Sequence, residues 1–79
     1  MLENKTVLIT GSSRGIGAAT AKLAHSYGAN VILHGKTESS ELVALAKEMG
    51  CMYIYCDISN ETEVKREVEK LGSIDILIN

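Results

Sequence analysis

Three glycines near the start of the chain lie between an apolar run and a helical pattern. Gly11, Gly15 and Gly17 belong to the segment 10–17, which follows the apolar residues 7–9. Glycine has no Cβ, so this segment can turn sharply and bring its backbone close to a ligand. A helix that begins here directs unpaired N–H groups and partial positive charge toward that ligand. The pattern therefore predicts a loop that binds the pyrophosphate of a dinucleotide.

The residues between the glycines exclude one class of phosphate-binding loop. A P-loop does not fit, because Ile16 stands where its second glycine would fall and no Gly-Lys-Ser/Thr sequence follows. Ser12 and Ser13 could give N–H or hydroxyl donors to the phosphates, or they could be small residues that suit the backbone of a turn. A glycine-rich turn without any ligand is the plain alternative to a phosphate-binding loop.

The elements that must position this loop alternate along the chain. Apolar runs predict four strands, at about residues 5–10, 30–35, 51–56 and 74–79. Helical periods predict three helices, at about residues 15–27, 41–49 and 61–71. The alternation predicts an α/β fold, a three-layer arrangement with a Rossmann-type parallel sheet. Right-handed crossovers order the strands 3-2-1-4, so residues 1–79 are expected to form the first half of one dinucleotide-binding domain, truncated at its fourth strand.

Spacing within the elements predicts how they pack. In the first helix, Ile16, Thr20, Leu23 and Tyr27 share one face, so we expect that face to cover the sheet. The fourth strand is apolar on both faces, as a buried parallel strand is, and its outer edge has no partner here.

Polar residues and glycines mark the expected helix ends. Ser39 or Ser40 is the expected N-cap of the second helix, and Gly50 is expected to end it. Asn60 is the expected N-cap of the third helix, with Glu63 completing a capping box.

Composition excludes several classes of protein. The 79 residues carry a net charge of -2 and 46% hydrophobic residues, which fits a folded α/β segment. The basic residues are scattered, so no nucleic-acid partner is expected. No apolar stretch approaches the ~18 residues that span a bilayer, and no targeting signal is present, so we expect a cytoplasmic location without a membrane partner. Cys51 and Cys56 are expected to be reduced, because the ends of one strand are too far apart for a disulfide and no Cys-x-x-Cys or His cluster indicates a metal site.

The glycine spacing also carries a resemblance to a known family. The stretch 10–17 reads Thr-Gly-Ser-Ser-Arg-Gly-Ile-Gly and resembles the Thr-Gly-x-x-x-Gly-x-Gly loop of short-chain dehydrogenases and reductases. It is most similar to the 3-oxoacyl-carrier-protein reductase branch. The resemblance implies an oxidoreductase that transfers hydride between a nicotinamide cofactor and a small carbonyl or alcohol substrate. It also implies a homo-oligomer for the complete enzyme.

The ends of the third and fourth strands extend this resemblance. The sequence Cys56-Asp57-Ile58 is similar to a family step whose Asp contacts the adenine amino group and whose next residue packs on the ring. These roles are therefore expected for Asp57 and Ile58, although Asp57 could instead only cap the following turn. Asn79 would be the first residue of the family's Asn-Asn-Ala-Gly motif.

The residues at the end of the second strand distinguish an NAD(H) site from an NADP(H) site. An NAD site places a carboxylate there for the ribose hydroxyls, but this chain has Gly35 followed by Lys36. Together with Arg14, Lys36 suits the 2′-phosphate of NADP(H), which we expect over NAD(H). Both cations could instead be solvated, and Glu38 could reach back to make an NAD site.

Catalytic residues are not expected in this chain. The family uses a Ser and a Tyr-x-x-x-Lys pair, and no tyrosine here has that lysine: the pairs are Tyr27 with Val31, Tyr53 with Asp57 and Tyr55 with Ser59. A nucleotide-binding or interaction module without catalysis is therefore the alternative function. A dinucleotide-sensing regulator is a third possibility, because fold alone does not determine function. His34, near the expected cofactor crevice, receives no role from its position alone.

Overall fold

Seven elements alternate along the computed structural model, which describes residues 1–79. The strands are β1 (Thr6–Ile9), β2 (Asn30–Gly35), β3 (Met52–Tyr55) and β4 (Ile76–Ile78). The helices are α1 (Gly15–Ser26), α2 (Ser40–Met49) and α3 (Glu61–Leu71). All strand pairs are parallel and the order is β3-β2-β1-β4, which confirms the order expected from the sequence.

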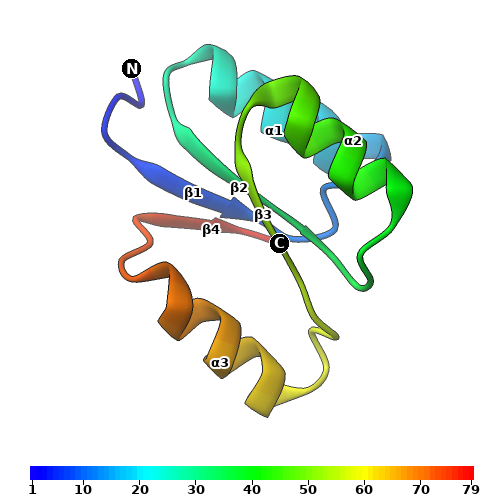
Figure 1. Ribbon diagram of the computed structural model, residues 1–79. Coiled ribbons are helices and arrows are strands. Elements are labelled where there is room, and N and C mark those ends of the chain that lie inside the picture. Colours follow the sequence, from blue (N-terminus) through cyan, green and yellow to red (C-terminus); the bar gives the residue numbers. More distant parts are fainter.

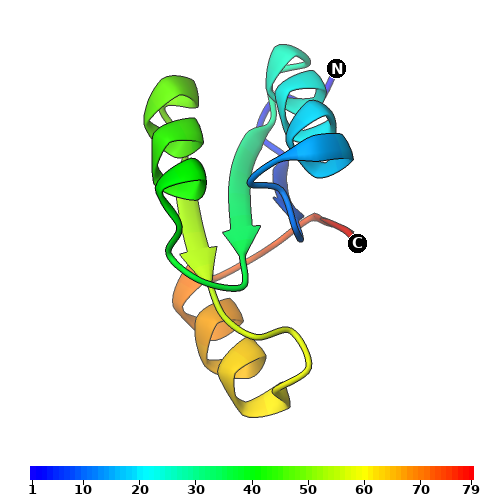
Figure 2. The same cartoon turned by 90° about the vertical axis from the view of Figure 1, so that its right-hand side faces the viewer.

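The helices form a layer on each face of this sheet. Figure 1 shows α1 and α2 together on one side and α3 on the other, and Figure 2 gives the same arrangement from a second direction. Alternate residues of β1 divide the core: Val7 and Ile9 pack with α1 and α2, while Leu8 packs with Ile32 and Ile54 toward α3. Because the strands are parallel, all their carboxyl ends meet at one edge of the sheet.

Local signals explain where the later helices begin. Ser39 is the N-cap of α2, and its hydroxyl accepts a hydrogen bond of 3.1 Å from Leu42 N. At α3, the Asn60 side chain accepts from Glu63 N at 3.1 Å. Glu63 does not complete the expected capping box, because its carboxylate accepts instead from Asp57 N at 3.4 Å. Its side chain therefore connects α3 to the end of β3.

The expected buried face of α1 is wrong. Ile16 and Leu23 are 87% and 57% exposed, and Tyr27 is exposed as well, whereas Ala21 and Ala24 are buried. A Cβ on Gly17 would lie 2.2 Å from Gly11 O, so the helix approaches the loop backbone too closely for a larger residue. Gly17, Ala21 and Ala24 follow the i, i+4, i+7 spacing of one helix face. Small residues therefore face the sheet, and the bulky ones turn outward.

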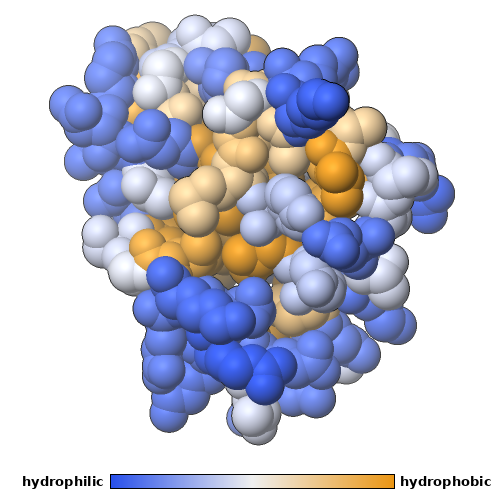
Figure 3. All heavy atoms as spheres, in the orientation of Figure 1, coloured by the Kyte–Doolittle hydropathy of each residue, from blue (hydrophilic) through white to orange (hydrophobic).

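Apolar side chains also reach the surface at β4. Ile76 and Leu77 are exposed, and β4 is hydrogen-bonded to β1 alone. Figure 3 shows hydrophobic surface across the middle of the molecule, between the side of α1 and α2 and that of α3. None of the three helices is long and apolar enough to cross a membrane.

Candidate cofactor-binding site

The residues expected to bind a cofactor gather at the carboxyl edge of the sheet. The glycine loop follows β1, Lys36 follows β2, Asp57 and Ile58 follow β3, and Asn79 follows β4. A cavity of about 220 Å³ opens there. Its lining includes Thr10, His34, Cys56, Ile58 and Asn79, with apolar residues of the sheet and α3 beneath them. Thus Ile58 and Asn79 reach one apolar hollow from two strand ends.

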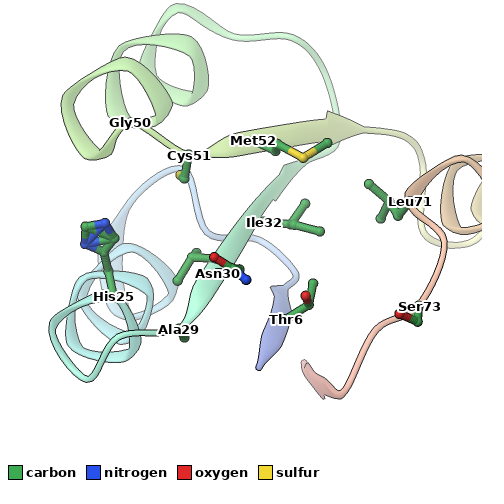
Figure 4. Close-up of a pocket in the computed structure, with 11 residues that line it drawn as sticks. Thr6, His25, Ala29, Asn30, Ile32, Gly50, Cys51, Met52, Leu71 and Ser73 are labelled. Carbon is green, nitrogen blue, oxygen red and sulfur yellow. The ribbon is translucent and has the colours of Figure 1, made fainter. Parts of the chain in front are cut away.

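A larger hollow of about 640 Å³ lies at the opposite edge of the sheet. Figure 4 shows it at the amino ends of the strands, where Thr6, Asn30 and Met52 line an open groove. None of the residues expected to bind a cofactor lines this groove. Parallel α/β sheets bind ligands at the carboxyl ends of their strands, so the smaller cavity marks the candidate site.

The three glycines of the loop have two structural roles. Gly11 and Gly15 have φ angles of +60° and +64°, in the left-handed region that favours glycine, and the space beside them is open. Gly17 instead allows the close contact between α1 and Gly11 described above. The loop therefore has open space beside Gly11 and Gly15, and Gly17 lets α1 pack directly against the loop backbone.

The N-terminus of α1 differs from those of the other helices. Arg14, its N-cap residue, makes no side-chain capping bond, whereas Ser39 and Asn60 cap α2 and α3. The first turn of α1 also has no acidic residue, while α2 and α3 carry glutamates there. Uncapped N–H groups and an uncompensated helix dipole favour an anion at this end. With the open glycine positions, this arrangement fits a pyrophosphate.

Ser12 has a structural role instead of the expected contact with phosphate. It is fully buried, and its hydroxyl donates to Ile9 O at 2.7 Å while accepting from His34 N at 2.8 Å. Its own N–H donates to His34 O at 2.9 Å. Both donors of Ser12 are therefore used within the protein. Ser13 is half-buried and Ile16 is exposed beside it, so these two residues remain available to a ligand.

His34 contacts both the glycine loop and the end of β3, and the sequence did not predict this role. Its ring is buried, with 5% of the residue exposed. Nδ1 lies 3.1 Å from Gly11 N, and Nε2 lies 3.0 Å from Cys56 O. The signal available in the sequence is its place at the end of a strand whose residues 31–35 are otherwise apolar or glycine. Its partners depend on the fold, because they lie 23 and 22 residues away along the chain.

Asp57 holds the turn after β3. Its Oδ1 accepts from Ser59 N at 3.0 Å and from Ser59 Oγ at 2.7 Å. These bonds lower the pKa of Asp57, and the nearby charge of Lys36 lowers it further. The structure therefore supports the turn-capping role of Asp57. The same contacts leave Oδ2 without a bond in the chain, so the expected role toward adenine stays a prediction.

The charged groups near the end of β2 have partners of their own. Arg14 Nη1 lies 3.6 Å from Glu41 Oε1 in an exposed pair. The Tyr53 hydroxyl donates to Glu38 Oε2 at 2.6 Å, and this bond raises the pKa of Tyr53. The other carboxylate oxygen of Glu38, Oε1, makes no hydrogen bond within the chain, so Glu38 stays a candidate for a contact with a ribose.

Gly35 has little room for the side chain that an NAD site requires. A Cβ there would lie 3.1 Å from both Leu42 Cδ2 and Thr37 O. Contacts this short require the neighbours to move by a few tenths of an ångström, so a carboxylate at this position would crowd the packing between β2 and α2. Lys36, the next residue, is exposed and free of this constraint.

Comparison with known protein families shows which family this chain belongs to. A family model described as short chain dehydrogenase matches residues 5–79. The chain belongs to the short-chain dehydrogenase/reductase family. It is 40% identical over 76 residues to the 3-oxoacyl-[acyl-carrier-protein] reductase FabG of Rickettsia typhi, covering 94% of this chain and 31% of that protein. It is 42% identical over 84 residues to tropinone reductase-like 2 of Erythroxylum coca, covering 99% and 30%.

Solved structures of this family share the observed fold. The chain matches the 3-oxoacyl-(acyl-carrier-protein) reductase of Agrobacterium tumefaciens with NADP bound, at 34% identity and a TM-score of 0.80, over 96% of this chain and 32% of that one. It matches the corresponding Brucella melitensis reductase complexed with NADH at 35% identity and a TM-score of 0.87, over 98% and 34%. The family expected from the glycine loop is confirmed. The chain spans about a third of the length of these relatives.

Proposed function

We propose that this chain is the NADP(H)-binding portion of an oxidoreductase that acts on a small carbonyl or alcohol substrate. The observation that carries the proposal is the uncapped N-terminus of α1 beneath two open glycines, Gly11 and Gly15. When bound, the nicotinamide would supply the hydride-transfer chemistry. Family membership supports the class of reaction and does not favour the alternative of a module without catalysis.

Each part of the site would have a separate task. The α1 N-terminus, Ser13 and Ile16 would hold the pyrophosphate end, and Asp57 with Ile58 would hold the adenine. Arg14 and Lys36 would bind the 2′-phosphate. The chain contains no Tyr-x-x-x-Lys pair, so proton transfer to the substrate would belong to other parts of the complete protein. A cytoplasmic homo-oligomer remains the prediction for that protein.

The preference for NADP(H) rests on Gly35 and on the two cations. The crowding at Gly35 disfavours a ribose-binding carboxylate there, and Lys36 and Arg14 are exposed near the expected ribose. Structures of relatives contain NADP in one reductase and NADPH in the protein BdcA, while another reductase contains NADH. Both cofactors therefore occur among relatives, and the residues of this chain must decide between them.

Binding measurements on the complete protein test the proposal. Titration with NADPH and NADH should give tighter binding of NADPH. Losing one hydrogen bond to a charged group costs about 1.5–3 kcal/mol, so Arg14→Ala or Lys36→Asp should weaken NADPH binding about tenfold or more. NADH binding should hardly change. Lys47→Ala, which removes an exposed cation from the far end of α2, is the matched control.

Two results would contradict the proposal in different ways. Equal binding of NADPH and NADH by the unaltered protein would refute the preference for NADP(H) and return Glu38 as a candidate ribose ligand. Binding of neither dinucleotide would refute the cofactor site itself.

A further inference from the structure

The ring of His34 connects two parts of the candidate site that are far apart in the sequence. Gly11 N–H can only donate a hydrogen bond, so His34 Nδ1 must accept it. The Cys56 carbonyl can only accept, so His34 Nε2 must carry the hydrogen. Both bonds are therefore satisfied by one form of the ring, the neutral imidazole with its hydrogen on Nε2.

These two partners are the anchor points of the cofactor site. Gly11 opens the glycine loop in a left-handed conformation, and Cys56 directly precedes Asp57 and Ile58. Ser12 binds the backbone of His34 through its N–H and its hydroxyl, so the loop is attached to the end of β2 at several points. The ring also lines the cavity at the carboxyl edge of the sheet. Its position thus sets how far the phosphate loop lies from the end of β3.

We propose that His34 is a positioning residue for the dinucleotide, and that its neutral ring holds the glycine loop against the end of β3. The proposal rests on the proposed function, because it concerns the same cofactor site. A doubly protonated ring would carry N–H on both nitrogens and could not accept from Gly11. The contact with the loop therefore depends on the acceptor at Nδ1.

Two substitutions separate the two ends of the ring. In His34→Asn, the amide oxygen can take the place of Nδ1 and accept from Gly11, but the side chain is too short to reach Cys56 O. In His34→Gln, the amide nitrogen can reach Cys56 O, but the acceptor for Gly11 is lost. His34→Asn thus keeps the bond to the loop, and His34→Gln removes it.

The test is NADPH titration of the complete protein and both variants at pH 8, with circular dichroism to confirm folding. His34→Asn should bind NADPH within about threefold of the unaltered protein, and His34→Gln about tenfold more weakly. Both variants replace the same ring by an amide, so the difference between them reports the acceptor for Gly11. If His34→Gln fails to fold, His34→Ala takes its place as the variant without that acceptor.

Several outcomes would overturn the proposal. Equal losses in both variants would show that His34 only fills space. A larger loss in His34→Asn than in His34→Gln would show that the acceptor for Gly11 does not hold the loop. If the unaltered protein binds neither NADPH nor NADH, the proposed function fails. If it binds them and the variants do not differ, only the role of His34 fails.

Discussion

Gly17→Ala is the substitution expected to damage the fold and the cofactor loop together. The added Cβ would lie 2.2 Å from Gly11 O and 2.9 Å from both Gly11 C and Ser12 Cα. All three are backbone atoms, so no side chain can rotate to relieve the contact. Ordinary van der Waals contact begins at about 3.4 Å. The helix and the loop must therefore separate by about 1 Å.

The size of the effect follows from this displacement. Overpacking of a well-packed site costs about 1–3 kcal/mol, and a clash with backbone belongs at the upper end of that range. Alanine recovers up to about 1 kcal/mol through its higher helix propensity. We therefore expect a net loss of about 2 kcal/mol in the free energy of unfolding. A shift of about 1 Å in the loop also removes about one charge-assisted hydrogen bond to the phosphates, a tenfold or greater loss of NADPH affinity.

Gly50→Ala provides the matched control. Gly50, unlike Gly17, is a left-handed glycine with open space beside it, and it ends α2 far from the loop. An alanine there costs about 1–2 kcal/mol through its backbone conformation alone. Urea unfolding of the complete protein should show similar losses of stability for both variants, while NADPH titration should weaken for Gly17→Ala only. If Gly17→Ala binds NADPH as tightly as Gly50→Ala does, the close approach of α1 does not shape the loop.

Two further predictions concern pH. Asp57 has a lowered pKa, so its contribution to stability is present above the ordinary value of about 3.8 and is lost as pH falls through the folded-state pKa. Ser59→Ala should raise the pKa of Asp57 toward that value, as measured by NMR titration of its carboxyl carbon, and an unchanged pKa would refute the assigned cause. Cys56 has a pKa raised by burial, so the folded protein should lose stability as pH rises above about 9.0. Cys56→Ala should reduce that loss in urea unfolding at pH 8 and pH 10, and a loss of equal size would count against it.

Much of the fold could be predicted because its signals are local. The alternation of elements, the N-caps Ser39 and Asn60 and the end of α2 at Gly50 each depend on a few neighbouring residues. Right-handed crossovers and a doubly wound arrangement then predict the strand order 3-2-1-4, which the structure has. The face of α1 could not be read this way, because two stripes at helical spacing compete. The stripe of small residues faces the sheet in place of the more hydrophobic stripe. The cause is the close contact of α1 with the loop backbone at Gly17, which only the three-dimensional fold shows.

The site shows the same limit at the level of single residues. Ser12 and Ser13 are identical side chains in one loop, and only the course of the backbone buries the first and leaves the second accessible. His34 acquires its partners because β2 lies between β1 and β3, which places Gly11 and Cys56 on either side of its ring. Residue types predicted where a cofactor could bind. The sheet determines which polar groups remain free to bind it.

The balance of charges near the expected ribose extends this reasoning to the choice of cofactor. The pair between Arg14 and Glu41 is exposed at 3.6 Å, and such pairs contribute about 0–1 kcal/mol, so Arg14 can exchange it for a phosphate at little cost. Glu38 accepts a 2.6 Å bond from the Tyr53 hydroxyl, and this bond is exposed to solvent too. Arg14 can therefore turn toward a 2′-phosphate, as the proposed NADP(H) site requires.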